Sequence, residues 1–486
     1  MTASWLGIDI GTSALKALLI SDDGVVLARS SVPYQDASTG PGALDEQDPA
    51  IWVDAAQAAV RECVREGGVP SGIGLTGQVP TLVLVDETGA VVRPAMTWRD
   101  ARAVTEAEEL ERELGPSEPH IGMDLPWSPA HLPAKLRWLA AHEPEAVRRS
   151  RHVLQPKDYL GLLLTGSTLS DAWSVKGIGH IRTGLASKAV MDACGWDADV
   201  CPPTAEPWAS RGATVGGTFG LPDGIDVSVG WSDALCSMLA VGAFDRPIAF
   251  ILTGTSEIVG MSTARSTGEA PGLYRIPIDC APRNVLYGPT QSSGGTAVWL
   301  ARVFDVPVEA LPDIAAGARG AVPPVFVPYI SGERAPLWRP DVRAVLAGLD
   351  AEDGRPEIVR SVLNGISLSA ADVLDIAAET AGETFDAIHI AGRGAADLAW
   401  KTIRLQTLGR PVLFHREPFV AALGAAMLGR AAATGGDLGS DLGSDLDRLR
   451  GAPTVCEPTP SDIDASTKAL ADYRSVSSFA QCWRTS

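Results

Sequence analysis

The stretch that decides the fold is Trp5-Leu6-Gly7-Ile8-Asp9-Ile10-Gly11-Thr12-Ser13-Ala14-Leu15-Lys16. It reads as a short apolar strand, a turn of small residues at Gly11-Thr12-Ser13, and a second strand from Ala14 to Ile20. A further turn over residues 21–24 leads into a third strand over residues 25–30. The pattern predicts a β-meander at the start of the chain.

The same pattern returns near the middle of the chain. Residues 249–263 again read as a strand, a turn at Gly254-Thr255-Ser256, and a strand. A repeat on this scale is not a short-period solenoid. It indicates two domains of similar build, although Gly-Thr-Ser is a common tripeptide and coincidence explains the echo equally well.

Other segments alternate between strand and helix patterns. Asp48-Pro49 reads as an N-cap followed by proline at the first helical position. Apolar residues then recur on one helical face at Ile51, Trp52, Ala55, Ala56, Ala59, Val60 and Cys63. Strands are expected over residues 73–76 and 81–85, so an α/β layered fold is favoured. Residues 434–451 carry a Leu-Gly-Ser-Asp repeat and predict a flexible surface loop, and residues 461–479 predict a returning helix.

Size and charge exclude several classes of protein. The chain has 486 residues, 45% of them hydrophobic, which indicates two to four domains. Its net charge of −19 argues against nucleic-acid and anionic-membrane partners, which prefer a basic face. The start shows no signal-peptide pattern, and no apolar run approaches the length of a membrane helix.

The seven cysteines are scattered from Cys63 to Cys482 without a C-x-x-C pair. This distribution suggests reduced thiols in the cytoplasm. No cysteine or histidine cluster has zinc-ligand spacing, so no zinc site is expected.

Turns of small residues between strands suit phosphate binding, because they expose backbone N–H groups and hydroxyls. Asp9 ends a buried strand just before the first turn, where a carboxylate is costly unless it meets a cation. Mg²⁺, which takes one or two carboxylates plus phosphates and waters, fits this position. Lys16 either adds positive charge to the same phosphates or is a solvated strand residue, and the two interpretations weigh equally.

Asp233 is the best candidate for a catalytic base. A short apolar strand ends at Gly230, and Asp233 opens an apolar helix that runs to Gly242, just before the second Gly-Thr-Ser turn. A base for phosphoryl transfer has to sit near the transferred phosphate and accept a hydroxyl proton. Local sequence alone favours the simpler interpretation, an acid that interacts with the helix dipole.

Rival motifs are weaker. No G-x-x-x-x-G-K-[ST] motif exists, which excludes a P-loop enzyme. Gly392-Arg393-Gly394 follows a strand, and Glu417 follows the next one, which partly imitates a dinucleotide fingerprint with Asp397 in place of the third glycine. That turn equally suits an adenosine. Ser128 and Ser331 lack the nucleophile elbow of a hydrolase.

The chain resembles the FGGY carbohydrate kinases over residues 4–432. Motifs occur in the family's order at Asp9–Lys16, Glu46–Pro49 with Trp52, Gly77-Gln78, Trp98–Arg102, Lys157–Leu160 with Thr165-Gly166 and Asp171, Gly230–Asp233, Gly254–Ser256, Ser293–Gly295 with Trp299, and Gly392–Ala395. The resemblance implies a two-domain actin-like ATPase (ribonuclease H-like) fold with an ATP cleft between the domains. It implies a sugar-binding domain over residues 1–245, a nucleotide-binding domain over residues 246–435, and a loop and C-terminal segment over residues 436–486 that packs on the body.

The resemblance also assigns roles to residues. Asp233 becomes the catalytic base, and Asp9 the ligand of Mg²⁺. The ATP-binding residues are expected to be Gly11, Thr12, Ser13, Lys16, Gly254, Thr255, Ser256, Gly294, Gly392, Gly394 and Asp397. The sugar-binding residues are expected to be Gln78, Val79, Trp98, Asp100 and Asp233.

Within the family, Tyr329–Pro336 and Gly77-Gln78 are most similar to the xylulokinases, which phosphorylate D-xylulose. That pattern continues with Met-His after the glutamine, whereas this chain has Val79-Pro80. Three alternatives therefore stay open: a kinase of another ketose or polyol such as ribulose, a catalytically silent sugar sensor on the same fold, and a nicotinamide oxidoreductase built on the Gly392 turn. The expected partners are the sugar and ATP, with no nucleic acid and no membrane, and a homodimer is left open.

Overall fold

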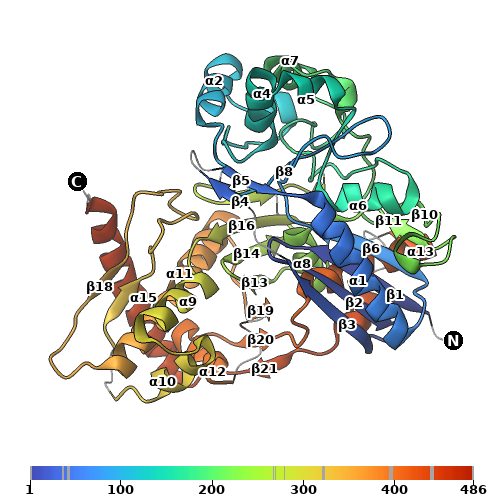
Figure 1. Cartoon of the computed structure of the whole chain (residues 1–486). Helices are drawn as coiled ribbons and strands as arrows, with labels where there is room; N and C mark the ends of the chain where they lie inside the picture. Colours follow the sequence, from blue (N-terminus) through green and yellow to red (C-terminus); the bar gives the residue numbers. More distant parts are fainter. Residues whose placement is uncertain are drawn as a thin grey trace. The chain divides into compact units, whose positions relative to one another are not determined.

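The computed structural model describes residues 3–34, 38–40, 44–265, 268, 270–278, 280–319, 323–392, 394, 398–437 and 443–483. They form two compact units (Figure 1). Unit 1 comprises Met1–Ala240 and Ala421–Arg450, and unit 2 comprises Val241–Val420 and Gly451–Ser486. Each unit is discontinuous in sequence, whereas the ranges expected above, 1–245, 246–435 and 436–486, are continuous.

A twisted mixed sheet forms the centre of unit 1. Its order is β10-β11-β6-β1-β2-β3, with the short β12 also paired to β6. The predicted meander is confirmed, since β1, β2 and β3 pair antiparallel in sequence order, while β6 runs parallel to β1. The strands are β1 (Ser4–Ile10), β2 (Ala14–Ser21), β3 (Val26–Pro33), β6 (Gly72–Gly77), β10 (Ser210–Ala213), β11 (Asp226–Ser228) and β12 (Trp231–Ser232).

The two faces of this sheet are covered differently. Strand side chains alternate between faces, so Leu6 and Ile8 of β1 pack with Trp52 of helix α1 (Pro49–Gly67), which lies along β2 and β3 (Figure 1). Gly7 faces the other way, toward helix α13 (Val420–Thr434). A Cβ at Gly7 would lie 1.8 Å from the carbonyl oxygen of Ala422, so the absence of a side chain lets the helix approach the strand.

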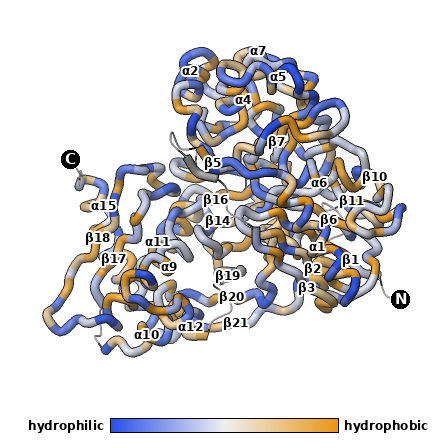
Figure 2. Tube along the Cα trace, in the orientation of Figure 1, coloured by the Kyte–Doolittle hydropathy of each residue, from blue (hydrophilic) through white to orange (hydrophobic). Residues whose placement is uncertain are grey.

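Helix α1 confirms the predicted capping. Asp48 accepts a hydrogen bond from the backbone N–H of Ala50 at 3.0 Å, and Pro49 occupies the first turn. The apolar runs of β1 and β2 stand out along the trace (Figure 2). The predicted apolar face of α1 is buried from Trp52 to Cys63, and Ile51 is partly buried against the same core.

The rest of unit 1 consists of smaller elements. The small sheets contain β4 (Ser38–Gly40), β5 (Leu44–Gln47) and β8 (Ala95–Met96), and β7 (Val83–Val85) with β9 (His152–Leu154). The helices are α2 (Val104–Leu114), α3 (Glu118–Ile121), α4 (Leu132–His142), α5 (Pro144–Arg149), α6 (Pro156–Thr165), α7 (Lys188–Cys194), α8 (Asp233–Ala240) and α14 (Gly443–Arg450).

Unit 2 repeats the topology of unit 1. Its sheet has the order β15-β16-β14-β13-β19-β20-β21, in which β13 pairs antiparallel with β14 and parallel with β19. The strands are β13 (Ala249–Thr253), β14 (Glu257–Thr263), β15 (Tyr274–Ile276), β16 (Asn284–Thr290), β19 (Ile388–Gly392), β20 (Val412–Phe414) and β21 (Thr454–Cys456), with β17 (Val325–Val327) and β18 (Val345–Ala347) in a separate pair. The helices are α9 (Gly294–Phe304), α10 (Leu311–Ala316), α11 (Arg355–Ala381), α12 (Leu398–Leu408) and α15 (Pro460–Cys482). The internal echo therefore reflects two sheets of one design.

Helix α11 is the one described helix that is long and apolar enough to cross a membrane by length and composition. The sequence did not reveal it because polar residues such as Asp372 and Asp375 interrupt its apolar runs. Its residues Val373, Leu374 and Ala377 lie in the core of unit 2, so it packs as a core helix.

The prediction for residues 434–451 was wrong over its last part. Residues 443–450 form helix α14, which buries Leu446 and Leu449 in unit 1. The guanidinium of Arg450 donates to the carbonyl oxygen of Leu239 at 3.0 Å. These long-range contacts stabilise a helix that composition alone does not suggest. The predicted helix over residues 461–479 is confirmed as α15.

Candidate active site

Three parallel strands of unit 1 end at the same edge of the sheet. In the β1–β6 register Asp9 lies beside Thr76, and in the β12–β6 register Trp231 lies beside the same Thr76. Two residues further along each chain, Gln78 and Asp233 therefore leave the sheet at one level, next to the end of β1. Ligands of open α/β sheets bind outside the carboxyl ends of strands, so this edge is the candidate site.

Asp9 is a buried carboxylate at this edge. It lies directly opposite Lys16 in the β1–β2 ladder, and Lys16 Nζ is 3.5 Å from Asp9 Oδ2. Burial raises the pKa of Asp9, and the positive charge of Lys16 opposes that rise. Asp9 Oδ1 is buried and accepts no hydrogen bond from the described residues. A buried carboxylate oxygen in this state is suited to a cation.

The first glycine turn is held by side chains from three other segments. The N–H of Gly11 donates to the carbonyl oxygen of Ala14 at 3.2 Å, which closes the turn. The Tyr34 hydroxyl donates a hydrogen bond to the Gly11 carbonyl oxygen. Gln47 Nε2 donates to the Thr12 carbonyl oxygen at 2.7 Å, and Trp98 Nε1 donates to Thr12 Oγ1 at 3.0 Å. Ser13 is exposed at the tip. The turn is thus fixed in shape before any ligand arrives.

Asp233 is the first residue of α8. Its Oδ1 accepts a hydrogen bond from the N–H of Ala234 at 2.7 Å. Burial, followed by the negative charge of Asp9, raises the pKa of Asp233 to about 7. A carboxyl group with this pKa exchanges protons near neutral pH, which is the property required of a general base.

The sugar-binding candidates have different surroundings. Gln78 is buried, and its N–H donates to the carbonyl oxygen of Ile10 at 2.9 Å. Val79 is half-buried and precedes Pro80 through a cis peptide bond. The N–H of Trp98 donates to Thr81 Oγ1 at 3.2 Å. Because Trp98 also contacts Thr12, it connects the predicted sugar-binding segment with the first glycine turn.

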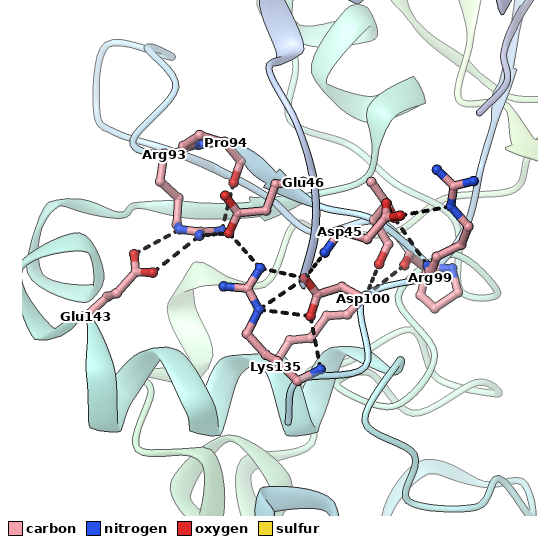
Figure 3. A network of polar contacts seen from close by, with 11 residues as sticks. Asp45, Glu46, Arg93, Pro94, Arg99, Asp100, Lys135 and Glu143 are labelled. Carbon is pink, nitrogen blue, oxygen red and sulfur yellow. Dashed lines mark hydrogen bonds and ion pairs between the residues drawn. The ribbon is translucent and has the colours of Figure 1, made fainter. Parts of the chain in front are cut away.

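Asp100 belongs to a buried ionic network (Figure 3). It accepts hydrogen bonds from the N–H of Asp45 at 2.8 Å and from Arg102 Nη2 at 2.5 Å, and Arg102 also reaches Glu46 at 2.7 Å. Lys135 of α4 lies beside the same network and donates to backbone carbonyl oxygens. Asp100 is fully buried and therefore shapes the loop around Trp98, while direct contact with a sugar stays a prediction.

The second glycine turn lies in unit 2, and Gly254 and Thr255 are exposed. The start of α9 packs on it, since the N–H of Gly294 donates to Gly254 O at 3.2 Å and the N–H of Gly295 donates to Thr255 O at 2.8 Å. A Cβ at Gly294 would lie 2.5 Å from Gly254 O, so only glycine fits. The first turn of α9 therefore lies against the Gly254-Thr255-Ser256 turn, and both features are of the kind that binds phosphate in proteins.

The third glycine turn follows β19. Gly392 has a φ of 103°, and a Cβ there would lie 2.3 Å from the carbonyl oxygen of Thr253. Thr253 Oγ1 donates to Ala391 O and accepts from the N–H of Gly394, both at 3.0 Å. Unit 2 therefore brings together four of the residues predicted to bind the nucleotide: Gly254, Gly294, Gly392 and Gly394. Asp397 lies outside the described residues.

A buried ion pair supports these turns and was missed by sequence reasoning. Glu257, directly after Ser256, pairs with Arg404 of α12, and both side chains are fully buried. Ser293 Oγ donates to Glu257 Oε1 at 3.0 Å, which also fixes the start of α9. Burial raises the pKa of Glu257, and Arg404 opposes the rise. An acid immediately after Gly-Thr-Ser in an apolar strand was the signal that could have revealed it.

Sequence reasoning did not single out two further residues near the candidate site in unit 1, Gln47 and Lys176. Gln47, seen only as part of a motif, bonds to Thr12 and Gln78. Lys176 is close enough to Asp233 for its charge to oppose the rise in the pKa of Asp233 that burial and Asp9 cause. The predicted motif residues Lys157, Asp158 and Asp171 instead form a buried ion cluster, with Lys157 Nζ 2.6 Å from Asp158 and 2.9 Å from Asp171.

The chain combines two sheets of the same topology, turns of glycine and hydroxyl residues, and a carboxyl group with a pKa of about 7. This combination defines a phosphotransferase of the actin-like ATPase fold. Residues 4–240 match the N-terminal domain of the FGGY family of carbohydrate kinases, and residues 249–433 match its C-terminal domain. The chain belongs to this family, whose members use ATP, and it is a sugar kinase. The Gly392 turn lies in a kinase domain, so the nicotinamide alternative loses its basis.

Individual relatives agree with this assignment. The chain is 29% identical to the xylulose kinase of Staphylococcus xylosus over 446 residues, which covers 87% of this chain and 89% of that one. A solved structure described as a xyloylose kinase from Brucella ovis superposes with a TM-score of 0.86 at 26% identity, covering 99% of each chain. The gluconate kinase of Lactobacillus acidophilus has the same TM-score and coverage at 23% identity, a likeness that shows the fold alone.

Proposed function

We propose that the chain transfers the γ-phosphoryl group of ATP to D-xylulose, forming D-xylulose 5-phosphate. The observation that carries the proposal is the strand register that sets Asp9, Gln78 and Asp233 at one edge of the unit 1 sheet. The choice of sugar is supported by relatives named xylulose kinase that match most of the chain.

Asp233 acts as the general base. Its pKa of about 7 leaves a large fraction of the carboxylate ionised at neutral pH, while keeping it basic enough to accept a hydroxyl proton. The Asp233 carboxylate takes the proton of the primary hydroxyl as that oxygen bonds to the γ-phosphorus and the bond to the ADP oxygen breaks. Lys16 and the backbone N–H groups of Thr12 and Ser13 neutralise charge on the transferred group.

Asp9 holds Mg²⁺ in this proposal, directly or through water. Its orphaned Oδ1 fits such a ion, because a hard cation prefers carboxylate oxygen. No cluster of three His, Cys, Asp or Glu side chains able to hold a metal occurs among the described residues. The remaining ligands would therefore be phosphate oxygens and waters, which is how Mg²⁺ is usually bound with nucleotides.

The nucleotide is proposed to contact the glycine turns named above. Exposed Gly254 and Thr255 present backbone groups and a hydroxyl, with Ser256 beside them, and the Gly294 and Gly392–Gly394 turns flank them in unit 2. Close approach of a ligand to the backbone is supported by the lack of side chains at these positions. Asp397 keeps its predicted role beside the nucleotide.

A second candidate is a kinase of another ketose or polyol, or of gluconate. It is favoured by Val79-Pro80, because neither side chain offers the hydrogen bond of the imidazole expected at this position. ADP release measured with D-xylulose, D-ribulose, glycerol and gluconate separates these substrates. D-xylulose is expected to give the highest kcat/KM, and a higher value for another compound would reassign the substrate. No ADP with any compound would favour the silent sugar sensor.

The catalytic assignment is tested with Asp233→Ala. This variant is expected to retain sugar binding by calorimetry and to lose about 10²–10⁴-fold in kcat. Asp192→Ala on the exposed face of α7 is the control, because the Asp192 carboxylate bonds to Lys188 on the same helix and is exposed to solvent. Wild-type turnover in Asp233→Ala would refute the role of the base.

A cytoplasmic location is proposed from the cysteines. All seven lie in the described part of the chain, and all are free thiols. Reduced thiols are typical of cytoplasmic proteins.

A further inference from the structure

Gln47, the last residue of β5, lies between the two predicted ligand-binding segments of unit 1. Its side chain is 3% exposed and makes three hydrogen bonds. Gln47 Oε1 accepts from Trp52 Nε1 at 3.2 Å and from Gln78 Nε2 at 2.9 Å, and Gln47 Nε2 donates to the Thr12 carbonyl oxygen at 2.7 Å.

These partners leave Gln47 only one amide orientation. The indole N–H of Trp52 can only donate, so it must face the amide oxygen of Gln47. The carbonyl oxygen of Thr12 can only accept, so it must face the amide nitrogen. Flipping the amide of Gln47 would place donor against donor at one end and acceptor against acceptor at the other.

The orientation of Gln47 in turn determines that of Gln78. Because Gln47 presents an oxygen, Gln78 has to present its NH₂ group, and its own Oε1 is directed elsewhere. Gln78 is 1% exposed, and its Oε1 is buried without a hydrogen-bond donor among the described residues. An unsatisfied buried carbonyl oxygen is costly, so it marks a place where a ligand can donate a hydrogen bond.

That free oxygen belongs to the strand edge that carries the catalytic groups. Gln78 follows Gly77, which pairs with Ile10 of β1 and with Ser232 immediately before Asp233. A hydroxyl group is the donor that a sugar offers at such a place. The amide NH₂ of Gln78 is already bonded to Gln47, so this residue accepts rather than donates.

We propose that Gln47 is a positioning residue: it orients the amide of Gln78 so that Gln78 Oε1 accepts a hydrogen bond from a sugar hydroxyl, and it ties that amide to Thr12 of the phosphate-binding turn. The inference rests on the proposed sugar site. It specifies that Gln78 accepts, and the sugar hydroxyl donates, the hydrogen bond at that site. It also links sugar recognition directly to the first glycine turn.

The main test is a double-mutant cycle with Gln47→Met and Gln78→Met, using the sugar that the wild-type chain phosphorylates best. Each single change is expected to raise the sugar KM about tenfold, the value of one neutral hydrogen bond. The double variant is expected to match Gln78→Met, because Gln47 acts on the sugar through Gln78. Only Gln47→Met is expected to raise the ATP KM as well. Multiplying effects, or an unchanged sugar KM in Gln47→Met, would overturn the proposal.

A second variant separates the two halves of the relay. Gln47→Glu keeps an acceptor for Trp52 and Gln78, but its ionised form cannot donate to the Thr12 carbonyl oxygen. At pH 8 it is expected to keep the sugar KM within about twofold of wild type and to raise the ATP KM about tenfold. Equal changes in both KM values would indicate a merely structural role and would contradict the proposal.

Gln155 provides the matched control, because it is a buried glutamine of unit 1 that contacts Thr81 and Ser174 but neither Gln78 nor Thr12. When Gln155→Met and Gln78→Met are combined, their separate effects on the sugar KM are expected to multiply. The ATP KM is expected to stay unchanged. If the wild-type chain phosphorylates no sugar, the proposed function fails. If it does and the cycle is multiplicative, only the role of Gln47 fails.

Discussion

Asp233 opens helix α8 at the sheet edge that Asp9, the penultimate residue of β1, also occupies, and the two carboxyl groups interact. Burial, and then the negative charge of Asp9, raises the pKa of Asp233 to about 7, against the smaller opposing effects of the Ala234 N–H and of Lys16 and Lys176. Asp9 itself is balanced by Lys16, whose Nζ is 3.5 Å away. The pKa of Asp233 is therefore set by its burial together with charged residues on other elements.

The pH dependence of turnover should report this interaction. Because the raised pKa keeps Asp233 protonated below about 7, kcat/KM for the sugar is expected to fall with one proton as pH drops through about 7. The measurement is an initial-rate profile from pH 5 to 9 at saturating MgATP. A midpoint near 4, the ordinary range of an aspartate, would contradict the assignment.

Neutralising Asp9 should act on both the metal and the base. Asp9→Asn removes the proposed carboxylate ligand, so the Mg²⁺ concentration for half-maximal rate is expected to rise at least about tenfold. It also removes the negative charge that raises the pKa of Asp233, so the midpoint of the pH profile for the residual activity should move below that of wild type. Magnesium titrations at pH 6 and 8 measure both effects, and an unchanged Mg²⁺ requirement would exclude Asp9 as a ligand.

Asp233 should lower stability at high pH. Its folded-state pKa lies above the unfolded value of 3.8, so its favourable contribution is complete below pH 3.8 and is lost as pH rises through about 7. Asp233→Asn removes the charge that burial penalises. Its melting temperature relative to wild type is therefore expected to be higher at pH 8 than at pH 5. Thermal unfolding at both pH values checks the sign, and an equal difference would refute it.

The ionic network around Asp100 should contribute strongly to the stability of unit 1. Asp100→Asn leaves Arg102 without one buried partner and is expected to destabilise the fold by about 3–5 kcal/mol. The control is Asp192→Asn, which breaks the exposed pair with Lys188 and should cost less than about 0.5 kcal/mol. Urea unfolding of both variants measures the contrast, and equal costs would contradict the structural role of Asp100.

The start of α9 should be sensitive to any side chain. Gly294→Ala places a Cβ 2.5 Å from Gly254 O, so the second glycine turn has to shift and the ATP KM is expected to rise about tenfold or more. Gly268→Ala is the control in unit 2, because a Cβ there meets no atom of another described residue within 4 Å. ATP titrations at saturating sugar compare them, and an equal KM in both variants would remove Gly294 from the nucleotide site.

Local patterns in the sequence were sufficient for the individual elements. The strands around Gly11 and Gly254 and the helix capped by Asp48 followed from apolar periodicity, turn residues and capping chemistry. These signals act over a few residues, so they are readable without neighbours. Composition failed at residues 443–450, where burial of Leu446 and Leu449 in unit 1 outweighs a loop-like sequence.

The sequence by itself thus determined that two similar strand–turn–strand units exist and that Asp9 and Asp233 are acids at strand and helix ends. Only the tertiary structure decided that they share an edge with Gln78, because strand register depends on pairing between segments far apart in the chain. It also decided that Asp100 is buried beside Arg102, and that the oxygen of Gln78 is the free end of its amide. Those properties come from the partners that folding brings together, and no local pattern encodes them.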